Sequence, residues 1–406
     1  MKKYREFMNC SQKIGCWCLS LGFITIWLNT MRFYNIIGHA LFPCFSVFFF
    51  FVGLLRKKGK RDCISILFFL VLGELFFSSI ISLIRNYELH YGQLCSYFLM
   101  LLLCFLLHQQ DLTVKDIREI LFSVMIGAII IAFLIIVLRT QYFEDDNTRL
   151  TILTRKGELV DPNFIGSILS TALSVGLFFL LEKRKNIVLI AVLILGFSVF
   201  LTGSRGAMLY CMITGTGFML ELMIRFKKTA RNIFLFFIVI FCLLPIGSLF
   251  LFHRYYDSFA RLFLNLSAYT SDASNLHRLE LWKNGLELFL RNPFLGQGIA
   301  REELMFERIL NLQNQTAHNT WLTLVNQLGL LGFIIYISPL IYMLLSFCSK
   351  RKIMLAAMLL GYLLNVTIIS APISYVFWLP YIVCILLLDY TKLESGCTKT
   401  EKEKAV

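Results

Sequence analysis

The chain has 406 residues, of which 58% are hydrophobic and only 16% are charged. Soluble domains carry about a quarter charged residues, so this composition excludes a soluble enzyme, a secreted disulfide scaffold, a coiled coil and a disordered protein, and indicates a polytopic helical membrane protein. The net charge of +14 comes from short basic clusters between apolar segments, which indicates membrane topology and no nucleic-acid partner.

Apolar segments of about 20 residues, the length that crosses a bilayer core, recur along the whole chain. The first follows a basic stretch like that of a signal peptide, but no small-x-small cleavage site follows it, so we expect a retained helix. The sequence predicts twelve spans, over residues 14–30, 33–55, 63–84, 94–109, 119–138, 163–181, 187–201, 207–224, 232–252, 321–347, 353–370 and 373–390. Alternatively, the last two form one re-entrant pair around Ala371-Pro372. The predicted fold class is an all-α polytopic transmembrane bundle.

Lys and Arg residues in the connecting segments predict the orientation of the bundle. With the N-terminus inside, the inner segments carry 25 of the 39 basic residues, the short outer turns carry 3 and the two long outer loops carry 11. Both termini are therefore predicted to be cytoplasmic.

This topology divides the chain into six segments, and it places the two longest polar segments on the outer side of the membrane. They are residues 1–138 (N-terminal transmembrane helices), 139–162 (a first outer loop), 163–252 (central transmembrane helices with an outer-face arginine motif), 253–320 (a large outer catalytic loop), 321–390 (C-terminal transmembrane helices) and 391–406 (a cytoplasmic tail). Long structured loops are frequent locations of function, so the outer loops are the first place to look for a site.

Glu74 is a carboxyl residue within the third predicted span. A charge at this depth is costly. A neutral, hydrogen-bonded Glu between helices is the favoured interpretation, and a role in a transport or proton pathway is the alternative.

Arg205 lies on the outer side, in the turn Thr202-Gly203-Ser204-Arg205-Gly206 between the seventh and eighth spans. Thr202 or Ser204 can cap the following helix, whose first turn offers free N–H groups and the positive end of the helix dipole. Together with the guanidinium, these groups favour an anion such as phosphate. An arginine that reaches lipid headgroups is an equally good interpretation of these residues alone.

The large outer loop contains a predicted amphipathic helix that starts near Asn275 and ends before Asn292-Pro293. Leu279, Trp282, Leu286 and Phe289 share one face at helical spacing. We expect the helix to lie on the membrane or on the bundle, with this face used for packing rather than for a ligand. Arg278 stands in its first turn, where an anion is again favoured.

His318 precedes the tenth span, in the sequence His318-Asn319-Thr320-Trp321. An imidazole near two arginines can accept a proton from a hydroxyl group. A structural His beside an interfacial Trp is the more common case, and the residue types alone favour it.

The order of these motifs resembles the O-antigen ligase and O-antigen polymerase superfamily. His318-Asn319, followed after nine residues by Gly329-Leu330-Leu331-Gly332, is similar to the signature of that family. Similar elements are Pro293-Phe294-Leu295-Gly296-Gln297-Gly298, the Thr-Gly-Ser-Arg-Gly-Ala sequence at 202–207, and Asp161-Pro162-Asn163. The resemblance covers roughly residues 160 to 335, and the first 150 residues match only in hydropathy.

This resemblance implies a membrane glycosyltransferase of the bacterial cytoplasmic (inner) membrane. Its donor would be an undecaprenyl-pyrophosphate-linked saccharide, and it would invert the anomeric centre without a metal or another cofactor. His318 would be the general base, or would orient the acceptor, while Arg205 and Arg278 would bind the pyrophosphate. The candidate substrate-binding residues are Ser204, Gly206, Asn319, Asn163 and Trp282. The expected partners are the acceptor glycan, membrane lipid and a polysaccharide chain-length regulator.

Metal independence also agrees with the residues themselves. The outer segments hold no Asp-x-Asp pair and no His/Asp/Glu cluster, and the adjacent Asp145 and Asp146 are expected to face solvent. The twelve cysteines include no Cys-x-x-Cys pair, so we expect neither disulfides nor a zinc site.

Three functions fit the sequence. The favoured one is a polymerase that joins repeat units of a surface polysaccharide such as O-antigen or capsule, and the second is a ligase that transfers finished glycan to lipid A core or another acceptor. The third is a transporter or flippase, which would be expected to show broken or charged helices at the midplane and two similar halves.

Overall fold

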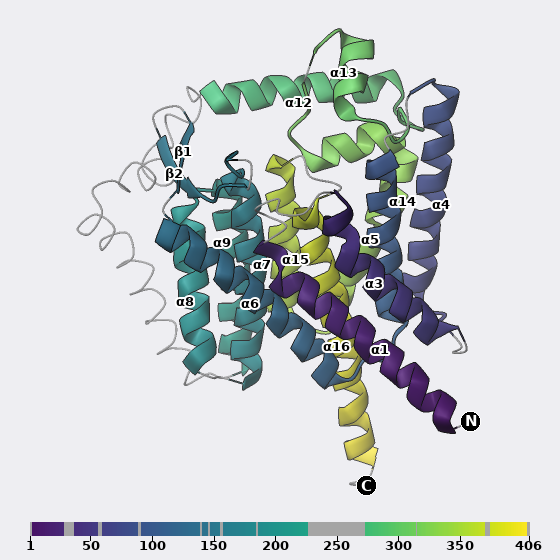
Figure 1. Cartoon of the computed structure of the whole chain (residues 1–406), viewed down its shortest axis with the longest axis vertical. Helices are drawn as coiled ribbons and strands as arrows, with labels where there is room; N and C mark the ends of the chain where they lie inside the picture. Colours follow the sequence, from purple (N-terminus) through teal and green to yellow (C-terminus); the bar gives the residue numbers. More distant parts are fainter. Residues whose placement is uncertain are drawn as a thin grey trace, which may run out of the picture.

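The computed structural model describes residues 2–27, 36–55, 59–87, 91–138, 140–144, 147–154, 157–183, 186–225, 273–313, 315–369 and 374–403. These residues form an all-α bundle with one small β-hairpin, which confirms the predicted fold class (Figure 1). The predicted ninth span, 232–252, lies outside the described residues.

The described elements follow the predicted apolar segments closely. They are α1 (Lys2–Ile24), α3 (Ile36–Leu54), α4 (Cys63–Ile84), α5 (Tyr91–Gln109), α6 (Val114–Leu138), β1 (Thr140–Glu144), β2 (Asn147–Thr151), α7 (Pro162–Lys183), α8 (Asn186–Leu201), α9 (Arg205–Arg225), α12 (Ala273–Arg291), α13 (Glu302–Leu310), α14 (Thr320–Ser349), α15 (Ile353–Asn365), the 3₁₀ turn η4 (Val366–Ile368) and α16 (Tyr375–Glu403). Seven of the described helices are long and apolar enough to cross a membrane, so the chain is a multi-pass membrane protein.

The predicted outer segments gather at one end of the bundle. Helices α12 and α13 and the β1–β2 hairpin lie at the upper end in Figure 1, whereas α1 begins and α16 ends at the opposite end. This arrangement agrees with the topology expected from the basic residues. The number of spans and the side that faces the cytoplasm stay predictions.

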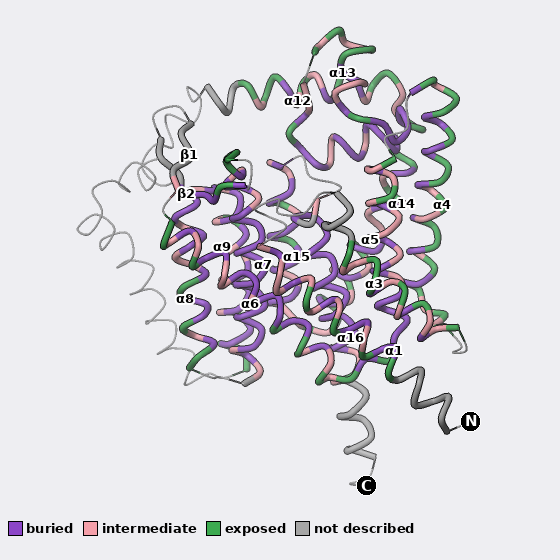
Figure 2. Tube along the Cα trace, viewed as in Figure 1, coloured by how far each residue is buried: buried purple, intermediate pink, exposed green. Residues whose placement is uncertain are grey.

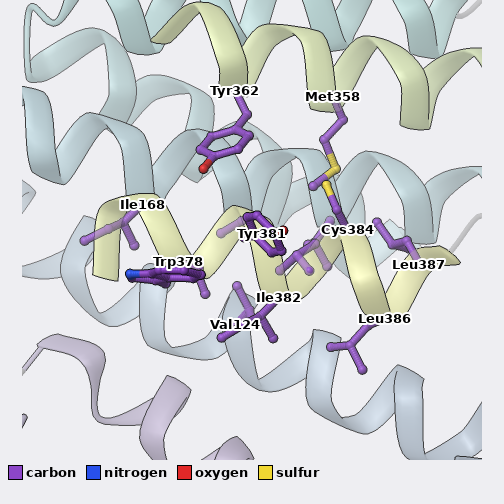
Figure 3. Close-up of a cluster of buried hydrophobic side chains, with 14 of the residues drawn as sticks. Val124, Ile168, Met358, Tyr362, Trp378, Tyr381, Ile382, Cys384, Leu386 and Leu387 are labelled. Atoms are coloured by element: carbon purple, nitrogen blue, oxygen red, sulfur yellow. The ribbon is translucent and has the colours of Figure 1, made fainter. Parts of the chain in front are cut away.

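The centre of the bundle is formed by α7 and α16, because both helices are apolar on all sides. Their membrane-spanning windows are 89% buried, and both appear mostly purple in Figure 2. Trp378, Tyr381 and Cys384 of α16 pack against side chains of α6, α7 and α15 (Figure 3). The hydroxyl of Tyr362 donates to the carbonyl of Phe377 at 2.9 Å, so α15 is also held to α16 by a polar contact.

A buried ion cluster joins three helices at the end opposite α12. The imidazole of His108 is fully buried, and its two ring nitrogens lie 2.9 Å from carboxylate oxygens of Asp62 and Asp389. Lys392 contacts Asp62 at 2.8 Å. These pairs connect the start of α4, the end of α5 and the middle of α16, away from the predicted outer loops.

Helix α12 begins at Ala273 rather than near Asn275, and its fully buried leucines lie outside the predicted apolar face. Leu281 and Leu288 are buried, whereas Leu279 and Leu286 of the predicted packing face are exposed. Gly285 allows close packing, since a Cβ there would lie 3.1 Å from the Cβ of Ala317, just before α14. Of the two expected locations for the predicted apolar face, the bundle therefore does not cover Leu279 and Leu286, and the membrane surface stays a prediction for them.

The predicted first outer loop contains an antiparallel hairpin that the sequence does not predict. Strands β1 and β2 pair in a register that sets Thr140 opposite Thr151, and the hydroxyl of Thr151 donates to the carbonyl of Val160. Asp145 and Asp146, which stand between the two strands in the sequence, lie outside the described residues. Leu153 and Leu159 form a further antiparallel bridge in the segment between β2 and the Asp161-Pro162-Asn163 sequence at the start of α7.

Candidate functional site

Arg205 is the first residue of α9, and the turn before it is arranged to start that helix. Gly203 has φ +60°, in the left-handed region that favours glycine. The Ser204 hydroxyl accepts from the Ala207 N–H at 3.4 Å, which is the N-cap role expected for Thr202 or Ser204. Arg205 is half-buried. As the first residue of α9, it stands at the positive end of the helix dipole, as the sequence predicts.

The predicted substrate residues beside Arg205 are engaged with protein. The buried Ser204 donates to the side-chain oxygen of Asn163 at 2.9 Å. A Cβ at Gly206 would lie 2.2 Å from Ile368 and 2.7 Å from the side-chain oxygen of Asn365. Ser204, Asn163 and Gly206 thus hold Arg205 in place, and direct contact with a substrate stays a prediction for all three.

His318 lies in the loop immediately before α14 with φ +46°, in the left-handed region. Non-glycine residues seldom adopt this conformation, although His does so more often than most. The next residue, Asn319, is the N-cap of α14, and its side-chain oxygen accepts from Trp321 N at 3.0 Å and Leu322 N at 3.2 Å. Asn319 therefore orients the start of α14, while the His318 side chain stays exposed.

The surroundings of His318 favour its neutral form. Partial burial of the ring and the positive charge of Arg278 lower the pKa of His318 below its ordinary value, and Asp161 partly opposes this effect. His277 also lowers the pKa. The charges that act on His318 therefore come from segments distant in the sequence, namely the start of α7 and the first turns of α12. A neutral imidazole near an arginine can accept a proton.

Residues 365–369, between α15 and α16, connect the Arg205 turn to the His318 loop. Gly206 packs against Asn365 and Ile368, as described above. The backbone N–H of Thr320 donates to the carbonyl of Ile369 at 2.9 Å, and the Thr320 hydroxyl donates to the same oxygen. Arg205 and His318 are thereby anchored on one short segment at the outer end of the bundle.

Trp282, the remaining predicted substrate residue, lies one turn after Arg278 on α12 and is half-buried. Its indole nitrogen is buried and makes no hydrogen bond within the part of the chain that the structure describes. An unpaired indole N–H beside Arg278 agrees with a ligand contact, because a buried donor usually finds a partner. The substrate contact itself stays a prediction.

The two glycine-rich motifs after α12 and within α14 bind each other through their backbones. Helix α14 is broken at Gly329, which has φ +67° and ψ 179°. The loop 293–299, hereafter the inserted loop, fills the break. Gln297 N and Gly298 N donate to the carbonyls of Asn326 and Gln327, and Leu330 N and Leu331 N donate to those of Pro293 and Phe294, over distances of 2.7 to 3.3 Å.

This pairing satisfies backbone groups at membrane depth. Gly329 is nine residues after Thr320, or about 13 Å along a helix. Irregular backbone is tolerated there only where protein or water satisfies it. The sequence does not predict this pairing, because the two partners lie some 30 residues apart along the chain.

Side chains of α4 and α5 secure the inserted loop. Arg85 donates to the side-chain oxygens of Gln297 at 2.6 Å and Asn292 at 2.8 Å. The hydroxyl of Tyr97 donates to Gln327 at 3.1 Å. Glu74 lies beside the break, accepts from Ser78 at 2.9 Å, and would touch any side chain at Gly332. These contacts show Glu74 hydrogen-bonded between α4 and α14, as the favoured interpretation of the sequence expects.

Replacing Gly329 with Ala should prevent correct assembly of the outer end. The new Cβ would lie 2.3 Å from the Phe294 carbonyl oxygen, and the positive φ adds strain of about 1–3 kcal/mol. We expect a clear loss of folded protein in detergent, measured by thermal unfolding. Gly215→Ala is the matched control, because nothing lies within 4 Å of its Cβ position. Equal stability of the two variants would contradict the pairing.

Comparison with known proteins gives one match. Residues 190–337 match the model of the family described as O-antigen ligase. This range includes Arg205, Arg278, His318 and both halves of the inserted-loop pairing. No curated protein and no solved structure shows a significant match to the chain.

Proposed function

We propose that the chain polymerises the repeat units of a surface polysaccharide, because its residues 190–337 match the model of the family described as O-antigen ligase. The donor is an undecaprenyl-pyrophosphate-linked oligosaccharide, and the reaction takes place on the outer face of the bacterial cytoplasmic membrane. The observation that carries this proposal is the family match, which spans Arg205, Arg278 and His318, and it is supported by the electrostatic effect of Arg278 and Asp161 on the pKa of His318.

In the proposed reaction, the neutral imidazole of His318 accepts the proton of the acceptor hydroxyl. The acceptor oxygen attacks the anomeric carbon from the face opposite the diphosphate, the bond from that carbon to the diphosphate oxygen breaks, and the configuration inverts. Arg205 and Arg278 stabilise the charge of the leaving diphosphate. The imidazolium then releases its proton to solvent, which its exposed position allows.

A ligase is the second candidate, because the matching family model carries that description. The two functions differ in what accumulates when the enzyme is absent. For a polymerase, mass analysis of lipid-linked glycans in cells without the gene should show single repeat units in place of long chains. Accumulation of long lipid-linked chains with no transfer to the final acceptor would identify a ligase and overturn the proposal.

The charges around His318 predict opposite shifts of the pH profile. The base must be neutral, so the rate should fall as the pH drops through the pKa of His318. Removing the positive charge with Arg278→Gln should raise that pKa and move the acidic limb of kcat/KM to higher pH. Asp161→Asn should move it to lower pH, since Asp161 raises the pKa. If the acidic limbs of the two variants shifted in the same direction, or if neither limb shifted, His318 would not be the titrating base.

Activity should survive chelation by EDTA, because the proposed mechanism stabilises the diphosphate with arginines instead of a divalent cation. Transfer by purified enzyme would be measured before and after EDTA, and again with added Mg²⁺ or Mn²⁺. Loss of activity that a metal restores would contradict this part of the proposal.

A further inference from the structure

An apolar stripe runs along α12 on its outward side. Leu279, Leu286 and Leu290 are 59%, 50% and 64% exposed. At about 100° per residue, these three positions lie within about 40° of one another. Phe294 and Leu295, in the inserted loop, extend the exposed surface beyond the end of the helix. We call these five residues the apolar stripe.

The three sides of α12 have different surroundings. Leu281 and Leu288 are buried against protein, as described above. Glu287 and Arg291 are exposed and pair with each other at 3.2 Å, about 80–120° around the helix from Leu279. Helix α12 therefore has a side buried against protein, a charged side and an exposed apolar side.

The apolar stripe is continuous with the outward surface of a membrane span. Leu331 N donates to the carbonyl of Phe294 at 3.3 Å, so the tip of the inserted loop lies directly on α14. Leu331 and Ile334 are exposed on that span. Figure 1 shows α12 running across the outer end of the upright helices, so that its length lies along the plane of a surrounding membrane.

We propose that the apolar stripe is immersed in the acyl chains of the outer leaflet. A stripe of large apolar side chains beside a charged edge, on a helix that lies across the spans, is the pattern of an interfacial helix. Immersion holds Arg278, on the same helix, at the level of lipid headgroups. This last consequence rests on the proposed function, because that is the level at which a lipid-linked diphosphate is found.

The direct test uses the unaltered protein in nanodiscs of phosphatidylcholine and phosphatidylglycerol. A lipid-soluble diazirine is photolysed in the bilayer, and the labelled residues are identified by mass spectrometry. Leu286, Leu290 and Phe294 should be labelled at least as strongly as Leu331, whereas Glu280 and Glu287 should not be labelled. Hydroxyl-radical oxidation from the water side should show the reverse pattern for α12.

Two other occupants of the stripe give different results. A stripe covered by another part of this chain would be protected from both reagents, and a stripe in water would be oxidised. Either result overturns the proposal. Undecaprenyl phosphate added to the nanodiscs should leave the labelling unchanged, and protection by it would assign the stripe to a polyprenyl tail instead.

A paired substitution separates this proposal from the catalytic one. Leu286→Glu should abolish labelling at Leu290 and Phe294, because a charge in the stripe lifts the helix from the acyl chains, while Glu287→Gln should preserve the labelling. Persistent labelling in Leu286→Glu would contradict immersion. These labelling measurements require no glycan transfer, so they test the immersion of the stripe independently of the proposed enzyme activity.

Discussion

Replacing His318 with Ala is expected to lower glycan transfer by about 10²- to 10⁴-fold, the range associated with loss of a general base. The physical reason is that the acceptor hydroxyl would keep its proton as its oxygen attacks. His318 is exposed and its side chain makes no helix cap, so the fold should persist. The measurement is the rate of chain extension by purified enzyme, with thermal unfolding to verify that the variant is folded.

His277→Ala is the matched control for this experiment. His277 is an exposed imidazole on α12 that acts on His318 only through its charge. Its removal should raise the pKa of His318 slightly and leave the maximal rate nearly unchanged. If His318→Ala retained full activity, the imidazole would have no place in the mechanism, and a loss of equal size in His277→Ala would point to a general disturbance of this surface.

Substitution of Arg205 is expected to have the second large effect. Arg205→Ala should lower kcat by about 10²- to 10³-fold, as for the loss of one donor to a developing negative charge. Arg205→Lys should recover only part of the rate, because an ammonium group keeps the charge but cannot form the paired hydrogen bonds of a guanidinium with a diphosphate. The measurement is kcat and KM with a lipid-linked donor.

Arg291→Lys provides the comparison for Arg205→Lys. Arg291 is an exposed arginine on the outer side that pairs with Glu287, and exposed pairs of this kind contribute about 0–1 kcal/mol. Its substitution should leave kcat unchanged. Wild-type rates in Arg205→Lys would indicate that Arg205 anchors the protein at the headgroups without binding diphosphate.

Most of the site could be located from the sequence because its elements are short and local. The turn around Arg205, the first turn of α12 and the His318 loop each follow or precede an apolar segment, so hydropathy alone places them near the membrane surface. Their convergence could not be derived in the same way. It depends on contacts such as Ser204 with Asn163 and Thr320 with Ile369, which join segments about 40 or more residues apart.

The amino-acid sequence by itself determined the membrane class, nearly all of the described helices and the end of the bundle at which to seek the site. These properties follow from hydrophobicity and charge summed over neighbouring residues. Only the tertiary structure decided the break at Gly329, the face through which α12 packs, and the lowered pKa of His318. Each depends on which distant groups satisfy a backbone or surround a charge, and a sequence pattern with a period of a few residues does not encode those partners.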